Sequence, residues 1–524
     1  MAKSLSARNF MIIFSVFLIL IILPCSFAVS ADDSNNDDFA LDLGNILSFN
    51  IDLDFLTNLF NFDDSFVSAA ESDGASGPGG DGSAPPDANG GAPDGGNGGS
   101  APGEGESQSG STEAKGAIVI NGSETYSGEL FNTSSEDTSV ILVKEVAKLV
   151  LSDSTLEKLG GDVSSTEDSE FTGVNAGILV QNGELEISNT QITTSASGAN
   201  ALFATGENAS VKASGLTIDT SKDSSRGIDV TYGGSVEADD VKINTQGEHC
   251  AALATDRGEG FITVTNSELN TNGAGSPCIY STGNITVSDS NGLATGSSAA
   301  VIEGKNSITL TNCNLENYAY GRTTDGIDCA GVMIYQSMSG DADEGTGTFI
   351  ATDTTIKVST ESSVYSTAPM FFITNTKALI NLENCNLDYG SGILLNVSSN
   401  DGEWGNEGSN GGDLEFNAKN QELIGDIYVD EYSSLQINLD SSSKLEGAIN
   451  SGSELAVVDI RLSSDSEWTL TDDSVVNSLV IDGDDLDKIH SNGHNIYYDA
   501  SDDANSWING TVSLSDGGKL IPLD

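Results

Sequence analysis

The sequence predicts an all-β solenoid, a parallel β-helix in which each turn of the chain adds one rung. Three observations support this fold class: an internal repeat with a commonest spacing of 23 to 26 residues, the scarcity of amphipathic helical patterns, and a composition of 59 Gly, 9 Pro and 6% aromatic residues. Ser, Thr, Asn and Asp fill the positions between apolar residues, as is typical of turns between short strands. One segment departs from this pattern: residues 141–159 predict a short helix that caps the first coil.

The repeat consists of eight stretches that share four columns. A second apolar residue follows the first after two positions, a turn-forming Asn, Asp or Gly after four, and an aliphatic residue after seven. In the fifth stretch, the last aliphatic residue is slipped by one position to Leu293. Alternation with a period of two predicts one strand on each side of the turn-forming residue. The stretches begin at Leu185, Val211, Val236, Ile262, Ile285, Ile308, Phe349 and Ile380.

Residues 1–31 have the pattern of a signal peptide. Lys3 and Arg8 precede an apolar run over 10–23, and small residues at 28–31 offer a cleavage site. The run is short for a membrane span, so an uncleaved anchor is the lesser alternative. We therefore predict a secreted or cell-surface protein that contacts a membrane only if this signal is retained.

Three segments follow the predicted signal peptide. Residues 32–73 are acidic with scattered Leu, Ile and Phe, and we expect this segment to be disordered. Residues 74–116 are rich in Gly, Pro and Ser and predict a flexible, disordered linker. Residues 117–524 form the predicted parallel β-helix, with irregular first coils.

The formal net charge of −59 excludes nucleic acid as a partner, because a phosphate backbone is bound by Lys and Arg. This charge favours a solvated, soluble surface outside the cell. An alternative is calcium bound at Asp-rich turns such as Asp482, Asp484 and Asp485, although no spaced calcium-loop motif is present. We predict no other cofactor, because a strand or loop gives His490 and His494 no shared face for zinc.

The cysteines and the glycosylation sequons give further expectations. Cys313 and Cys385 follow the turn-forming residue of their stretches, and we expect both to be buried thiols. Cys250 and Cys278 fall in adjacent coils, so they are the predicted disulfide pair. Asn-x-Ser/Thr sequons, which are candidate glycosylation sites in an exported protein, occur at Asn121, Asn132, Asn208, Asn284, Asn396 and Asn509.

The repeat, with its segment 262–269 and its column of Asn and Asp, resembles the right-handed parallel β-helix superfamily with the pectate-lyase-like fold. In character it is most similar to prokaryotic adhesin-like surface proteins. The resemblance covers about three quarters of the chain and implies a right-handed solenoid. Segment 324–328 also looks like the Asn-Thr-Asp-Gly-x-Asp motif of polygalacturonase-type hydrolases, which would make Asp325 and Asp328 catalytic carboxylates. Against this, Thr323 replaces the Asn, and Gly-Ile-Asp recurs at 227–229, as expected of solenoid register.

Binding is better supported by the sequence than catalysis. Two insertions, 337–348 and 398–413, break the repeat, and loop insertions on a solenoid make recognition surfaces. Trp404 in the second insertion is the candidate sugar-stacking residue, with a loop-anchoring role as the alternative. We therefore expect an adhesin-like protein that binds carbohydrate or another surface protein. A polysaccharide hydrolase or lyase on the same scaffold and a structural envelope component are the alternatives.

Overall fold

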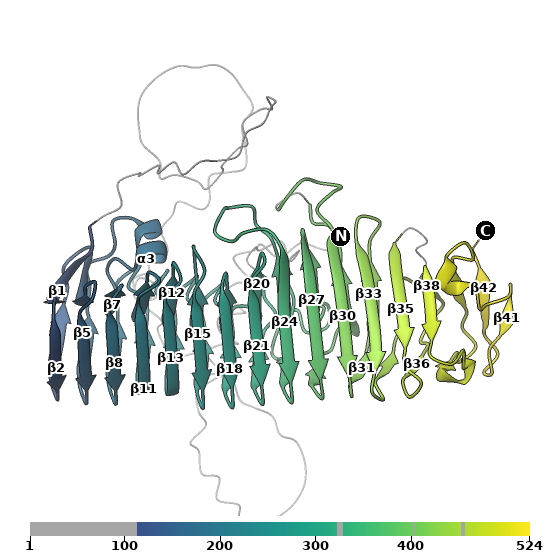
Figure 1. The fold of residues 1–524 in the computed structure, drawn as a ribbon, viewed down its shortest axis with the longest axis horizontal. Coiled ribbons are helices and arrows are strands. Elements are labelled where there is room, and N and C mark those ends of the chain that lie inside the picture. Colours follow the sequence, from purple (N-terminus) through teal and green to yellow (C-terminus); the bar gives the residue numbers. More distant parts are fainter. Residues whose placement is uncertain (1–112, 322–328, 402–403, 452–455, 524) are drawn as a thin grey trace, which may run out of the picture. The chain divides into compact units, whose positions relative to one another are not determined.

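The computed structural model describes residues 113–321, 329–401, 404–451 and 456–523. Nearly all regular structure in these ranges is β-strand, and the strands stack side by side in chain order as a solenoid (Figure 1). The predicted signal peptide, the acidic segment and nearly all of the predicted linker lie outside the described residues. The first strand begins at Lys115, two residues before the predicted start of the solenoid. Among the described residues, no helix has the length and apolar character needed to cross a membrane.

One long sheet, here called sheet A, takes one strand from each of twelve coils, and all its neighbouring strands are parallel. Parallel neighbours are expected, because each coil returns to the same face before its strand pairs. Its strands are β1 (Lys115–Ile120), β4 (Thr138–Val143), β7 (Ile178–Gln181), β10 (Leu202–Thr205), β12 (Ile228–Thr231), β14 (Leu253–Thr255), β17 (Ile279–Ser281), β20 (Ala300–Glu303), β23 (Val332–Tyr335), β26 (Phe371–Thr374), β29 (Ile393–Val397) and β32 (Asp426–Val429).

The predicted repeat forms two further parallel ladders, one before and one after the turn-forming residue. The first ladder is β2 (Ser123–Ser127), β5 (Lys148–Ser152), β8 (Glu184–Ser188), β11 (Ser210–Thr220), β13 (Ser235–Thr245), β15 (Phe261–Thr265), β18 (Asn284–Ser288), β21 (Ser307–Thr311), β24 (Thr346–Thr352), β27 (Thr376–Glu383), β30 (Gly412–Lys419), β33 (Ser434–Asp440), β35 (Val457–Leu462) and β38 (Ser478–Ile481). The second, which also uses the ends of β11 and β13, is β3 (Leu130–Thr133), β6 (Thr155–Lys158), β9 (Gln191–Thr194), β16 (Glu268–Thr271), β19 (Asn291–Ala294), β22 (Asn314–Asn317), β25 (Thr355–Val358) and β28 (Asn386–Asp388).

The last coils end in two small sheets. The strands β41 (Val512–Ser513) and β42 (Lys519–Pro522) pair antiparallel, unlike the other strand pairs of these sheets. One sheet is β31 (Glu422–Ile424), β34 (Lys444–Glu446), β36 (Glu467–Thr469) and β39 (Ile489–His490); the other is β37 (Ser474–Val476), β40 (Ile496–Tyr498), β42 (Lys519–Pro522) and β41 (Val512–Ser513). Two short 3-10 turns, η3 (Leu486–Lys488) and η4 (Asp503–Asn505), lie between these strands.

The register predicted from the repeat is confirmed. The residues that begin the eight stretches pair in the predicted order, from Leu185 with Val211 to Phe349 with Ile380. All eight turn-forming residues have positive φ, between 48° and 61°. Asn, Asp and Gly tolerate this left-handed conformation better than other residues, which explains the composition of the column.

Two local predictions are wrong. The fifth stretch is not slipped, because Gly292 pairs with both Leu269 and Leu315 while Leu293 stands outside the column. A methyl group at Gly292 would lie 2.9 Å from Cys278 Sγ and 2.9 Å from Leu315 Cδ2, so these two side chains occupy the missing space. Residues 141–159 form β4, β5 and β6 instead of a helix, because their alternating aliphatic side chains enter the solenoid core. The helix of this region is α3 (Thr166–Thr172), capped by Ser165 and Gly173.

Candidate functional site

Sheet A has a column of outward-facing residues, one on each strand, here called the outer column. In strand order it is Val119, Leu142, Leu179, Phe203, Asp229, Ala254, Tyr280, Val301, Met333, Phe372, Asn396 and Tyr428. The strand residues on either side, such as Ile228 and Val230, point into the core. Most of the outer column is nevertheless buried, while its ends, Val119 and Tyr428, are 37% and 42% exposed. Other segments of the chain must therefore cover the middle of this face.

The first of these segments is α3 with its C-cap Gly173, here called the N-terminal cover. Gly173 has φ 71°, and a methyl group there would lie within 2.7 Å of Leu179 Cδ1 and 2.4 Å of Phe203 Cδ1. Thr231 Oγ1 donates a hydrogen bond of 2.9 Å to the carbonyl of Phe171. Only glycine lets the backbone approach the outer column this closely, so the chain leaves α3 directly against Leu179 and Phe203.

The second segment comprises residues 336–345 and the described residues of 398–411, here called the insertion cover, and arises from the two insertions that break the repeat. Trp404 packs on Tyr335 with ring centroids 4.6 Å apart, in a cluster with Met333 and Phe372 of the outer column. Asn410 Nδ2 donates to the carbonyl of Trp404 at 2.9 Å, which satisfies a buried backbone group of the loop. Aromatic packing and amide hydrogen bonds together fix this cover on sheet A.

Trp404 was predicted to stack on a sugar, but its side chain lies against the protein. Only 4% of Trp404 is exposed, because the loop folds back onto Tyr335 and Met333. In this structure it therefore has the alternative role of anchoring the loop. The polar residues next to Trp404 in the sequence suggested an exposed side chain. Sequence neighbours do not show which surface the loop folds onto, and here that surface is apolar.

Beneath the N-terminal cover lies a buried cluster of charged side chains around Arg226. Its guanidinium nitrogens lie 3.1 Å from Asp256 Oδ2, 3.5 Å from Glu170 Oε1 and 3.8 Å from Asp229 Oδ2. Asp229 is fully buried, and neither of its carboxylate oxygens has a hydrogen-bond partner that meets the usual geometry among the described residues. From the sequence, the recurrence of Gly-Ile-Asp at 227–229 indicated only that these residues occupy equivalent positions in successive coils, and it did not predict a charged cluster. A usable signal was Asp229 itself, since it stands between Ile228 and Val230 where other coils place Phe203 or Tyr280.

Burial changes the protonation of this cluster. It raises the pKa of Asp229 well above the ordinary range, and the nearby carboxylate of Asp256 raises it further. Burial also raises the pKa of Asp256 to about 6, although the charge of Arg226 opposes this rise. For Arg226, burial lowers the pKa, but Asp256, Glu170 and Asp229 outweigh burial and raise it overall. At neutral pH, Arg226 is therefore charged, Asp256 largely ionised and Asp229 still prone to hold its proton.

One arginine joins the two covers. The guanidinium of Arg257 lies 4.0 Å from the centroid of the Phe171 ring in the N-terminal cover. The same guanidinium is 2.7 Å from the carboxylate of Asp341 in the insertion cover. A second ion pair, 2.9 Å between Lys305 and Asp343, holds the same loop to the neighbouring coil. Both pairs are partly exposed, so each adds little stability on its own.

An open groove of about 580 Å³, here called the insertion groove, lies between the two parts of the insertion cover. Gln336 is buried on its wall, and its Nε2 donates 3.1 Å to the carbonyl of Ala342 while its Oε1 has no partner among the described residues. Met338, 55% exposed, adds an apolar surface. The groove thus combines donors, acceptors and one thioether. Its described polar lining is Gln336, Glu344, Asn375, Thr376, Lys377, Asn406, Ser409 and Asp413.

Cys250 and Cys278 are both buried free thiols, so the predicted disulfide is not present in this structure. Cys250 stacks between two serines: its Sγ accepts a hydrogen bond of 3.0 Å from the Ser225 N–H, and its own N–H donates 2.8 Å to Ser276 Oγ. Cys278 lies two residues further along its coil and faces Gly292 in the core. The two thiols belong to adjacent coils but to different columns. Cys313 and Cys385 are buried, as predicted.

The remaining predicted site residues are scattered. Asp325 and Asp328 lie outside the described residues. Asp482, from the predicted calcium turns, instead pairs with Arg461 at 2.8 Å, and Asp484 adopts a positive φ of 54° in its turn. Among the six sequons, Asn284 and Asn396 are partly buried, and the exposed ones are Asn121, Asn132, Asn208 and Asn509.

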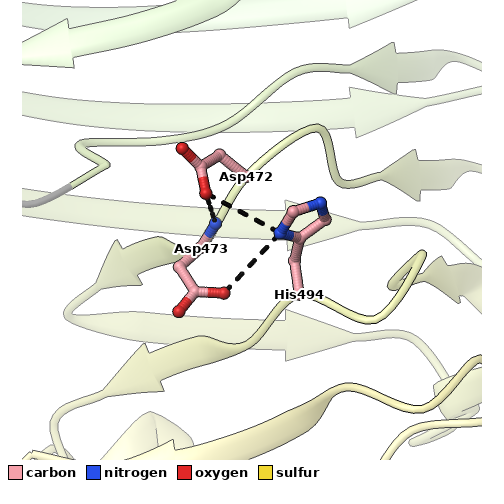
Figure 2. Close-up of side chains that lie close together, drawn as sticks. All are labelled: Asp472, Asp473 and His494. Carbon is pink, nitrogen blue, oxygen red and sulfur yellow. Dashed lines mark hydrogen bonds and ion pairs between the residues drawn. The ribbon is translucent and has the colours of Figure 1, made fainter.

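A different set of side chains has the donor types of a cation site (Figure 2). His494 Nδ1 lies 3.7 Å from Asp472 Oδ1 and 3.8 Å from Asp473 Oδ1. Asp472 Oδ1 accepts the Asp473 N–H at 2.8 Å, and Asp473 Oδ1 accepts the Asn495 N–H at 2.7 Å. The two carboxylates thus already accept hydrogen bonds from backbone N–H groups of their turns.

Comparison with known proteins found no relative of this chain: no protein-family model matches it, and no curated protein matches it.

Proposed function

We propose that the chain is a secreted or cell-surface, adhesin-like protein of the right-handed parallel β-helix superfamily that binds carbohydrate in the insertion groove. The observation that carries this proposal is the groove itself, which lies between the two segments that interrupt the repeat. Insertions into a solenoid are the usual source of its recognition surface. The groove is also large enough for a few sugar residues, since ligand sites commonly measure about 300–1,000 Å³.

The chemistry of the lining fits a polyhydroxylated ligand. Asn375, Asn406 and Ser409 offer amide and hydroxyl groups, each of which both donates and accepts hydrogen bonds. Met338, which is 55% exposed, offers an apolar patch for ring carbons. The net charge of −59 disfavours anionic polymers at long range, so we expect a neutral or basic glycan.

The insertion cover is held firmly on sheet A, which favours a role in ligand binding. Trp404 and Tyr335 hold the base of the groove in the buried aromatic cluster, and Asn410 donates to the loop backbone. A preformed site avoids the entropy cost of ordering its loops when ligand arrives. The fixed insertion cover therefore suits recognition of an extended polymer.

The test is affinity electrophoresis and calorimetry of the full chain with neutral, basic and acidic polysaccharides. Asn406→Ala should weaken binding about fivefold, because an amide hydrogen bond contributes about 1 kcal/mol. Asn386→Ala is the matched control, since Asn386 is an exposed asparagine on β28 outside the groove. Absence of binding to every polysaccharide, or equal losses for both variants, would contradict the proposal.

A polysaccharide hydrolase or lyase is the second candidate, favoured by the carboxylates of Asp229 and Asp256. Buried acids with raised pKa values are typical of acid–base chemistry as well as of structural clusters. Both acids lie beneath α3 and Arg226, so a substrate would reach them only after the N-terminal cover moved. Release of reducing ends or unsaturated products, lost in Asp229→Asn or in Asp325→Asn with Asp328→Asn, would establish catalysis and displace the binding proposal as the primary one.

A further inference from the structure

The outer column continues beyond the insertion cover, and its last two members are only partly covered. Phe372 is buried in the cluster around Trp404, Asn396 on the next strand is partly buried, and Tyr428 on the strand after that is 42% exposed. Asn396 pairs with Tyr428 in register, so their side chains lie about 4.8 Å apart on the same face. The final coils of sheet A therefore present an amide beside an exposed aromatic ring.

A groove of about 420 Å³, here called the Tyr428 groove, follows these two residues. Val364, Thr367 and Pro369, from the segment before β26, also line it. None of the described residues that line this groove is charged, in a chain with 79 acidic residues. Within the described lining a cation would find no carboxylate, and the field of the whole chain opposes an anion. The lining thus selects an uncharged ligand.

The hydrogen-bonding groups of this groove are available. The side-chain amide of Asn396 and the hydroxyl of Tyr428 make no hydrogen bond with a described residue. A pyranose ring has an apolar C–H face and hydroxyls at its rim. An exposed tyrosine with a neighbouring amide matches both, because the ring packs on the C–H face while the amide both donates to and accepts from hydroxyls.

We propose that the Tyr428 groove is a second carbohydrate site, specific for an uncharged sugar ring that stacks on Tyr428 and hydrogen-bonds to Asn396. The site lies on β29 and β32 and on the residues that precede β26, whereas the insertion groove follows the end of β26 at Asn375 and Thr376. The inference rests on the proposed function and extends it, since it names the ligand class and predicts two sites per chain. It also gives the Asn396 sequon another interpretation, in which the amide is a ligand contact and carries no glycan.

Calorimetric titration of the full chain with a neutral oligosaccharide from the best-binding polysaccharide tests the number of sites. We expect two sites for the wild type, with the Tyr428 site about tenfold weaker in Tyr428→Ala and within about threefold of the wild type in Tyr428→Phe, which keeps the ring. Ser398→Ala is the matched control, because it removes the sequon while leaving the Asn396 amide in place. Asn406→Ala should affect only the other site.

The outcomes separate the two proposals. Saccharide binding that Asn406→Ala weakens and Tyr428→Ala leaves unchanged would overturn this inference and keep the proposed function. A glycan on Asn396, detected by peptide mass spectrometry of the secreted chain, would also overturn it, because that glycan would fill the groove. Failure of every neutral saccharide to bind would overturn this inference alone, and failure of every polysaccharide, basic ones included, would overturn both.

Discussion

Two covers protect the same face of sheet A by opposite chemistry. The N-terminal cover lies over Arg226, Asp229 and Asp256 and contributes Glu170 to their cluster, in which Asp229 is fully buried. The insertion cover lies over a mainly aromatic and apolar cluster built on Trp404, with one buried carboxylate, Glu303, which accepts a hydrogen bond of 3.0 Å from the Tyr335 hydroxyl. Burying ions is costly unless they are well paired, so the charged cluster requires several groups in one arrangement. Because these groups titrate, its stability also depends on pH. Apolar packing depends only on area and fit.

Removal of the central charge should have the largest effect. Arg226→Met leaves Asp256 and Glu170 without their shared counter-ion, so we expect the opening free energy of the N-terminal cover to fall by about 3–5 kcal/mol. Hydrogen exchange of the α3 amides measures this opening. Arg461→Met is the control, because Arg461 pairs with Asp440 and Asp482 at the partly exposed surface and should cost about 1 kcal/mol or less. Similar losses of opening free energy in Arg226→Met and Arg461→Met would contradict the view that the buried charged cluster holds the N-terminal cover in place.

Trp404→Ala should come next and should act on the other cover. Loss of a buried tryptophan costs about 3–5 kcal/mol, reduced where the emptied loop collapses, so we expect about 3 kcal/mol. Hydrogen exchange should increase in 398–411 and remain unchanged in α3. Trp404→Phe retains the contact with Tyr335 and should lose less than half as much. A loss shared equally by both covers would mean that they open as one unit.

The pH dependence of the two covers should differ. Folding raises the pKa of Asp256 from 3.8 to about 6 and raises that of Asp229 as well, so the closed state holds more protons than the open state above about pH 4. The opening free energy of the N-terminal cover should therefore be highest near pH 4 and fall by about 1–3 kcal/mol as the pH rises through 6.

Asp229→Asn should remove much of this fall, because asparagine has the shape of the protonated acid and cannot ionise. Hydrogen exchange of α3 between pH 5 and pH 8 checks this, after correction for the intrinsic exchange rate. Arg226, Asp256 and Glu170 remain in place in the variant. The insertion cover serves as the internal reference. An unchanged pH profile in the variant would assign the dependence to the overall acidity of the chain.

The smallest effect should come from the contact that joins the covers. Arg257 touches Phe171 on one side and Asp341 on the other, and both interactions are partly exposed. Asp341→Asn should cost about 0.5–1 kcal/mol, with a similar coupling energy in a cycle with Arg257→Gln. Salt should weaken this coupling, whereas the Trp404 effect should not respond to salt.

The sequence predicts the ladders well and the covered face of sheet A poorly, for a physical reason. The alternation of apolar and polar residues around Asn266 or Asn312 indicates which residues face inward, and the positive φ at these two positions fixes the turn. In sheet A the strand residues Ile178, Leu179 and Val180 are all apolar, because the strand is buried on both faces, and such a run gives no inward or outward direction.

The covers could not be located because they do not repeat. The sequence marks the insertions as interruptions, but the position of Trp404 depends on tertiary contacts with Tyr335 and Met333. Arg226 and Glu170 lie 56 positions apart and meet only because α3 folds back across two coils. The partly covered pair, Asn396 and Tyr428, can be recognised only once the extent of the insertion cover is known.

The outer column also fixes the distance between features on this face of sheet A. From Asp229 to Met333 it passes through four parallel pairings, which at about 4.8 Å each separate the charged cluster from the aromatic cluster by about 19 Å. Addition or loss of one whole coil between them would change that distance by one fixed increment without altering either cluster. Coil number thus sets the spacing of features along this face in discrete steps, independently of their chemistry.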